Sequence, residues 1–146
     1  MSSPLTLEQI NARIEASAFN RLIGVRAESY DGTELVLYCP MRPELLGSPS
    51  TGAIHGGVLA TLVDASTCLA VIARTGDSVA TVDLRVDYHR AGRSDGFRAH
   101  ARIVRIGRTL ATVDCRVLDD AGELVASGRA VLMNVAASVP GTRSAR

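Results

Sequence analysis

The chain has 146 residues, of which 47% are hydrophobic and 21% charged, so we expect one globular protein with a sizeable core. The net charge of +1 and the 3% share of aromatic residues argue against a basic nucleic-acid-binding surface and against a base-stacking platform. No basic segment followed by an apolar run opens the sequence. We therefore expect no signal peptide, a cytoplasmic location, and neither a nucleic-acid nor a membrane partner.

The first predicted element is a helix over residues 5–18, in which apolar residues recur at helical spacing. Thr6 and Gln9, three residues later, resemble a capping box. Residues 19–24 are typical of a turn or of a short continuation of the helix. We therefore treat residues 1–22 as an N-terminal helical segment.

Two strands follow, over residues 25–30 and 34–39, and the dipeptide Asp31-Gly32 between them predicts a hairpin. Residues 40–52 are rich in Pro, Gly and Ser and predict a loop of about a dozen residues, a length that is often functional.

A long helix is predicted over residues 56–74, and it is hydrophobic on nearly every side. Such a helix is expected to be buried on all sides. Of the eighteen residues between His55 and Arg74, only Asp64 is charged, and a central Asp argues against a membrane span. A carboxylate is rarely buried without a partner or a use. Asp64 is therefore either a functional residue or one that caps or pairs inside the core, for example with an arginine.

After this helix the hydrophobic period becomes two, which predicts strands joined by short, antiparallel connections. Their expected bounds are residues 79–88, 96–106, 109–118 and 123–135. In the first of these strands, alternation places Val82, Leu84 and Val86 on one face and the charged residues on the other.

The order of elements predicts an α+β fold in which an antiparallel sheet wraps one long central helix. This domain takes up residues 23–136, and residues 137–146 are expected to form a disordered tail. The cysteines Cys39, Cys68 and Cys115 are widely spaced and read as core residues in a reducing compartment. The spacing does not support a metal site but leaves one possible, and we expect no cofactor.

The stretch HGGVLATLVD, followed by TVDLRVDYHRAG, RIGRTL and LVASGRAVL, resembles the hotdog-fold acyl-CoA thioesterases of the phenylacetate-degradation (PaaI) type. The resemblance covers about residues 28–135. It implies the hotdog fold, hydrolysis of a coenzyme A thioester, and a pair of subunits whose sheets join edge to edge with active sites at their interface.

The resemblance also implies roles for four residues. The Gly56 N–H polarises the thioester carbonyl, Asp64 acts as base or nucleophile, and the Thr81 hydroxyl helps to hold the water. His55 either orients the loop or carries a proton, and Thr81 is alternatively an ordinary strand residue.

Five further residues are candidates for substrate binding. Gly57 adds a second N–H at a helix N-terminus, where a developing negative charge is favoured. Ser48 stands, with Pro49, where related thioesterases often carry an asparagine. Arg90, Arg93 and Arg108 lie near strand ends and are suited to the phosphates of coenzyme A, the alternative being a solvated surface.

Helix geometry gives an independent expectation about assembly. Asp64 follows Gly56 by eight residues, which is roughly 12 Å along a straight helix. One carbonyl carbon cannot contact both groups of the same helix. If both serve one site they come from two chains, so we predict a dimer with two interface sites. Separately, we expect such dimers to pair into tetramers.

Two other functions fit the same fold. One is a non-catalytic module that binds acyl-CoA or another small ligand, because fold does not fix function. The other is a hotdog-fold hydratase acting on enoyl thioesters, and such enzymes resemble one another by a catalytic Asp that is followed five residues later by a histidine. Leu69 occupies that position here and argues against it.

Overall fold

The computed structural model describes residues 3–135, so the predicted tail at 137–146 lies outside the described residues. Its helices are α1 (Leu7–Ala16), α2 (Ala18–Ile23), the 3-10 helix η1 (Pro43–Leu45) and α3 (Gly56–Thr75). Its strands are β1 (Arg26–Tyr30), β2 (Glu34–Pro40), β3 (Leu46–Ser48), β4 (Ala53–Ile54), β5 (Val79–Tyr88), β6 (Gly96–Ile106), β7 (Leu110–Asp119) and β8 (Leu124–Asn134).

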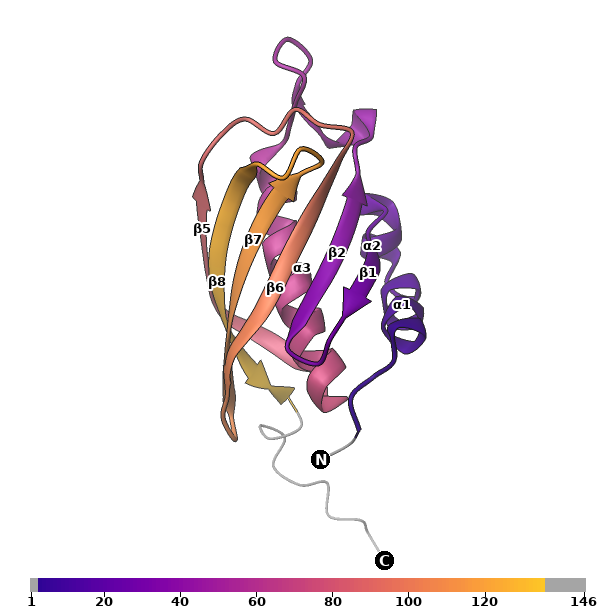
Figure 1. Ribbon diagram of the computed structural model, residues 1–146, viewed down its shortest axis with the longest axis vertical. Coiled ribbons are helices and arrows are strands. Elements are labelled where there is room, and N and C mark those ends of the chain that lie inside the picture. Colours follow the sequence, from indigo (N-terminus) through magenta and orange to yellow (C-terminus); the bar gives the residue numbers. More distant parts are fainter. Residues whose placement is uncertain (1–2, 136–146) are drawn as a thin grey trace, which may run out of the picture.

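Six strands form one antiparallel sheet in the order β1-β2-β6-β7-β8-β5. The sheet curves around α3, and α1 and α2 lie at its β1 side (Figure 1). The predicted α+β hotdog arrangement is therefore confirmed. Its core lies between α3 and the inner face of the sheet, where Phe97, Leu62 and Val113 are among the largest fully buried side chains.

The N-terminal segment folds as two short helices. Thr6 and Gln9 form the predicted capping box, with the Thr6 hydroxyl accepting from the Gln9 N–H. The first helix ends at Ala16, earlier than predicted, because Ser17 caps a second helix by accepting from the Asn20 N–H.

The long helix α3 begins and ends at cap residues. His55 is its N-cap, and Gly76 ends it with a φ of 77°, a left-handed conformation that favours glycine. By length and composition α3 could cross a membrane, but half of its most apolar window is buried inside the protein. Packing against the sheet thus accounts for its apolar residues.

The sequence predicted that α3 is buried on all sides, and this prediction is wrong. One side of the helix carries Thr61, Asp64, Ala65 and Cys68, which are only partly buried. The sheet covers the opposite side, so this partly exposed side is the wall of a cleft described below.

Residues 40–52 are more structured than the predicted loop. They contain η1 and β3, and β3 pairs with β4 in a small hairpin. The turn closes because the N–H groups of Thr51 and Gly52 both donate to the Ser48 carbonyl. A φ of 63° at Gly52 suits glycine, which explains the composition of this segment.

Strand β5 contains a bulge that the alternation pattern did not predict. Its register against β8 shifts between Thr81 and Asp83, so Val82 is the extra residue and is 59% exposed. The prediction that Val82 shares the inner face with Leu84 and Val86 is therefore wrong. Beyond the bulge, Leu84 and Val86 pack against the core as expected.

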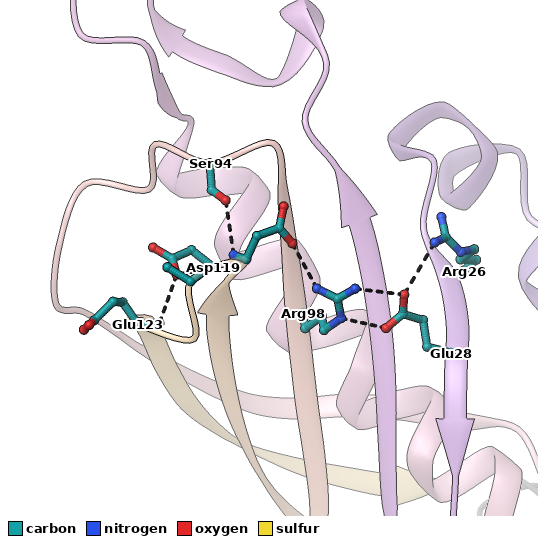
Figure 2. A network of polar contacts seen from close by, with 8 residues as sticks. Arg26, Glu28, Ser94, Arg98, Asp119 and Glu123 are labelled. Atoms are coloured by element: carbon teal, nitrogen blue, oxygen red, sulfur yellow. Dashed lines mark hydrogen bonds and ion pairs between the residues drawn. The ribbon is translucent and has the colours of Figure 1, made fainter.

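The outer face of the sheet pairs charges across strands (Figure 2). Arg98 on β6 donates to Glu28 on β1 at 2.7 Å and to Asp120 in the β7–β8 turn at 2.9 Å. Between these strands, the Tyr38 ring lies under the guanidinium groups of Arg26 and Arg98, at 4.4 and 4.6 Å. These contacts tie β1, β2 and β6 together on the face opposite the core.

Candidate active site

Asp64 lies on the partly exposed side of α3 and accepts a hydrogen bond from Thr81. The Thr81 Oγ1 to Asp64 Oδ1 distance is 2.7 Å. The bulge in β5 explains this contact, because it puts Thr81 on the same inward side as Val79, Leu84 and Val86. The structure thus brings together two of the predicted site residues.

The alternative interpretation of Asp64 as part of a core ion pair does not fit. Among residues 3–135, no Lys, Arg or His side chain forms an ion pair with its carboxylate. Within the same part of the chain, the Thr81 hydroxyl is the one side-chain group that donates to it. The carboxylate therefore keeps acceptor capacity for a further donor, such as water.

Cys68 is a third member of this cluster, and the sequence interpretation missed it. Its Sγ lies 3.3 Å from the Thr81 Oγ1. Burial raises the pKa of the Cys68 thiol, so the group stays protonated near neutral pH. A signal was present in the sequence, since Cys68 follows Asp64 by four residues and so lies on the same side of the helix.

A cleft of about 400 Å³ opens beside Asp64, between α3 and the N-terminal helices. Its walls are mainly apolar. They consist of Ala16, Phe19, Thr61, Asp64, Ala65, Cys68, Leu69 and Ile72, with Arg13 and Asn20 as further polar residues.

A second cleft, of about 370 Å³, adjoins the first and shares Phe19 and Thr61 with it. It leads along α3 to His55 and Gly57 at the start of the helix. Phe19 and Leu22 on α2 line this second cleft and are 55% and 69% exposed, so two large apolar side chains are open to solvent there. The two clefts together form an apolar path along α3 from its N-terminus to Asp64.

The N-terminus of α3 presents one unused donor. The His55 Nδ1 accepts from the Gly57 N–H at 2.8 Å, so His55 acts as a helix cap and its neutral ring carries the proton on Nε2. The Gly57 N–H is therefore occupied, although Gly57 lines the second cleft. Among the described residues, no acceptor is recorded for the Gly56 N–H.

Tyr88, at the end of β5, packs against this N-terminus. Its hydroxyl donates to the Gly56 carbonyl at 2.8 Å. A Cβ on Gly56 would lie 3.3 Å from the Tyr88 ring, so glycine allows this close approach. Tyr88 belongs to the strand motif, but the motif alone does not predict this contact.

The two candidate catalytic groups remain apart within one chain. Helix α3 is continuous from Gly56 to Thr75, so the rise of roughly 12 Å between Gly56 and Asp64 holds. Strand β5, which carries Thr81, is the last strand of the sheet and pairs only with β8 among residues 3–135. Its free edge thus lies next to Asp64.

The structure does not bring Ser48 to either cleft. Ser48 lies in the β3–β4 hairpin, where its hydroxyl forms a 2.9 Å hydrogen bond with the Ser50 hydroxyl. Neither cleft beside α3 includes it.

The candidate arginines lie at strand ends, as predicted, but not together. Arg90 forms an ion pair of 3.2 Å with Glu123, and Arg93 donates to the Thr51 carbonyl at 2.7 Å. Both precede β6, whereas Arg108 follows it. Strand β6 has eleven residues and is roughly 33 Å long. One phosphate cannot contact both groups of arginines within a single chain.

The other cysteines are core residues. Burial raises the pKa of Cys39 to about 11 and that of Cys115 to about 12. In the described part of the chain, no group of three or more His, Cys, Asp or Glu side chains is arranged to hold a metal ion.

Residues 51–126, which include His55, Gly56, Asp64 and Thr81, match the sequence model of the Thioesterase superfamily. The chain is 28% identical to the medium/long-chain acyl-CoA thioesterase YigI of Escherichia coli strain K12, over 91% of this chain and 99% of that protein. It is also 28% identical to the human acyl-coenzyme A thioesterase 13, over 84% of this chain and 89% of that protein.

A solved structure gives a similar result. The X-ray structure of a thioesterase-superfamily protein that is 42% identical superposes with a TM-score of 0.82. The match covers 87% of this chain and 96% of that one. The similarity therefore extends over nearly the whole domain and includes the helix that carries Asp64.

Proposed function

The chain belongs to the thioesterase superfamily and is a thioester hydrolase, and we propose that it cleaves an acyl-CoA to the free acid and coenzyme A. One observation carries the assignment of the site. Asp64 stands in an apolar cleft, without an ion-pair partner among residues 3–135, and with Thr81 Oγ1 donating to its carboxylate at 2.7 Å.

In the proposed reaction Asp64 acts as general base. It takes a proton from a water whose oxygen attacks the thioester carbonyl carbon. The C–S bond then breaks, and the proton passes to the departing sulfur to give the coenzyme A thiol. Direct attack by the Asp64 carboxylate, followed by hydrolysis of the resulting anhydride, uses the same residue as nucleophile.

The negative charge on the carbonyl oxygen needs a donor, and we assign this role to the Gly56 N–H. It lies at a helix N-terminus, where the helix dipole favours negative charge, and no acceptor is recorded for it in the described part of the chain. His55 and Gly57 have a supporting role, because His55 caps the helix and fixes its first turn.

The separation of Gly56 and Asp64 leads to a two-chain site. We propose that a second copy pairs along the free edge of β5, a ten-residue strand that pairs with β8 on its other edge. Each active site then takes Asp64 and Thr81 from one subunit and Gly56 from the other. Pairs of such dimers form the proposed tetramer.

The path along α3 is the proposed site of the acyl chain. Its walls are apolar, and Phe19 and Leu22 lie exposed beside it. The E. coli relative acts on medium and long acyl chains, and we propose the same class here. Membership of the phenylacetate-degradation type, with an aromatic acyl group, is the alternative within this family.

The coenzyme A moiety extends over the surface. Arg90, Arg93 and Arg108 are the proposed phosphate contacts. Arg90 and Arg93 lie at the opposite end of β6 from Arg108, so all three can serve one site only if two subunits contribute. Neither cleft of its own chain includes Ser48, so we propose that it contacts the substrate from the second subunit. The enzyme is proposed to act in the cytoplasm, without a cofactor and without nucleic-acid or membrane partners.

The test is hydrolysis of a panel of straight-chain acyl-CoA thioesters and phenylacetyl-CoA by wild type and by Asp64→Asn, with free thiol as the readout. We expect wild type to hydrolyse members of the panel, and Asp64→Asn to lose at least about 10² in rate while staying folded. Asparagine has nearly the same shape as aspartate, so it is a suitable control for packing.

The opposite result would identify a different function. If wild type binds acyl-CoA but hydrolyses no member of the panel, the chain is a binding module. The absence of the usual asparagine near residues 48 and 49 would then be the leading explanation.

A further inference from the structure

We propose that Cys68 is a positioning residue for the reaction, whose thiol holds the Thr81 hydroxyl in the orientation that donates to Asp64. This inference rests on the proposed function, in which Asp64 is the base. Cys68 is not proposed to touch the reacting atoms, and its effect passes through Thr81.

The direction of each hydrogen bond follows from the number of protons. Asp64 as a carboxylate can only accept, so the 2.7 Å contact uses the single hydroxyl proton of Thr81. The 3.3 Å contact between Cys68 Sγ and Thr81 Oγ1 then has no proton left on the Thr81 side. The Cys68 S–H must therefore be the donor, and the chain of bonds runs from Cys68 through Thr81 to Asp64.

These two hydrogen bonds restrict the rotation of the Thr81 hydroxyl group. A β-branched side chain has few χ1 rotamers, but its hydroxyl proton still rotates about the C–O bond. A thiol donor on one side of the oxygen favours the orientation in which the proton points to the other acceptor, Asp64. Cys68 and Asp64 lie one helical turn apart on α3, so the two bracket Thr81.

Cys68 is also part of the cleft wall, and this role must be distinguished experimentally from the orientation of Thr81. Cys68 lines the cleft beside Asp64, so its loss could also change acyl-chain binding. A wall residue acts mainly on KM, whereas a residue that orients Thr81 acts on kcat. The kinetic parameters therefore distinguish the two.

The first experiment compares Cys68→Ala with Cys68→Ser on the best acyl-CoA of the panel. Because the thiol–hydroxyl hydrogen bond is weak, we expect Cys68→Ala to lower kcat by about three- to tenfold with KM nearly unchanged. Cys68→Ser keeps a donor and should recover most of kcat. An unchanged kcat in Cys68→Ala, or an equal loss in both variants, would overturn the proposal.

The second experiment repeats Cys68→Ala in a Thr81→Val background. If Cys68 acts through Thr81, its substitution should have no further effect on kcat once the hydroxyl is gone. A purely structural contribution would lower kcat by the same factor in both backgrounds and would contradict the proposal.

A spectroscopic readout keeps the test independent of activity. The infrared S–H stretching band of Cys68 is isolated by subtracting the spectrum of Cys68→Ala from that of wild type. We expect Thr81→Val to shift this band to the higher frequency of a thiol that donates no hydrogen bond. A band that does not move refutes the inferred bond, whereas an inactive wild type with a shifted band refutes only the proposed function.

Discussion

The Thr81 hydroxyl donates to Asp64 at 2.7 Å although the two residues lie seventeen positions apart and on different elements. This contact joins the partly exposed side of the central helix to the free edge strand of the sheet. It depends on the bulge at Val82, without which Thr81 would point to the outer face together with the charged residues of β5.

The first prediction concerns this hydroxyl. Thr81→Val has nearly the same shape but cannot donate, so we expect kcat to fall about tenfold through loss of a hydrogen bond to a charged group. Thr81→Ser keeps the hydroxyl and should stay within about threefold of wild type in the same steady-state assay. Equal kcat values for the valine variant and wild type would remove Thr81 from the site.

Much of the fold follows from local patterns in the sequence. The capping box at Thr6, the Asp31-Gly32 hairpin and the period of two after residue 79 predicted their elements to within a few residues. Each signal depends on chemistry within a few residues of the element, which is why it can be read without knowledge of tertiary contacts.

The features that the sequence did not predict depend on packing between distant elements. No Gly or Pro marks the bulge at Val82, so strict alternation gave that residue the wrong face. Likewise, the cleft beside Asp64 exists because α1 and α2 leave part of α3 uncovered. No local sequence pattern predicts which part of a helix its neighbours leave uncovered. Asp64 was therefore recognised from its isolated charge, but its surroundings were not.

The second prediction tests the Gly56 N–H. A side-chain substitution cannot remove a backbone donor, but Gly56→Pro can, and proline is favoured at the first position of a helix. His55, the preceding residue, already has a ψ of 133°, which proline tolerates. We expect Gly56→Pro to lower kcat by about 10²–10³, the usual effect of losing an oxyanion donor.

Gly56→Ala is the matched control for that substitution. It adds a Cβ that lies 3.3 Å from the Tyr88 ring, as proline also would, but it keeps the N–H. The alanine variant should therefore retain most of kcat, with any loss reporting the displaced Tyr88 ring. If alanine and proline reduce kcat equally, the N–H is not the oxyanion donor.

The third prediction concerns chain length. Phe19 lines both clefts and is 55% exposed in the single chain, so a long acyl chain would cover its ring. Phe19→Ala should lower kcat/KM by on the order of tenfold for the longest substrate and little for the shortest. Val104→Ala, an equally exposed apolar side chain on β6 outside both clefts, is the control. An equal loss for all chain lengths would contradict the proposed acyl site.

The fourth prediction concerns the close packing of β5 against β8. A Cβ at Gly128 would lie 2.4 Å from the Arg85 carbonyl oxygen and 2.8 Å from a methyl group of Val63 on α3. Gly128→Ala should therefore lower the free energy of unfolding by about 1–3 kcal/mol, measured by urea denaturation. An unchanged midpoint of unfolding would show that β5 can move away freely.

The last prediction tests the two-chain site by mixing two inactive variants. Gly56→Pro lacks the oxyanion donor and Asp64→Asn lacks the base. In a mixed dimer, one site combines both defects, whereas the other takes an intact Gly56 from one chain and an intact Asp64 from the other. Random pairing makes half of the dimers mixed, so co-refolding equal amounts should restore about a quarter of wild-type activity. If both groups acted within one chain, every site would keep one defect and the mixture would stay as inactive as its components.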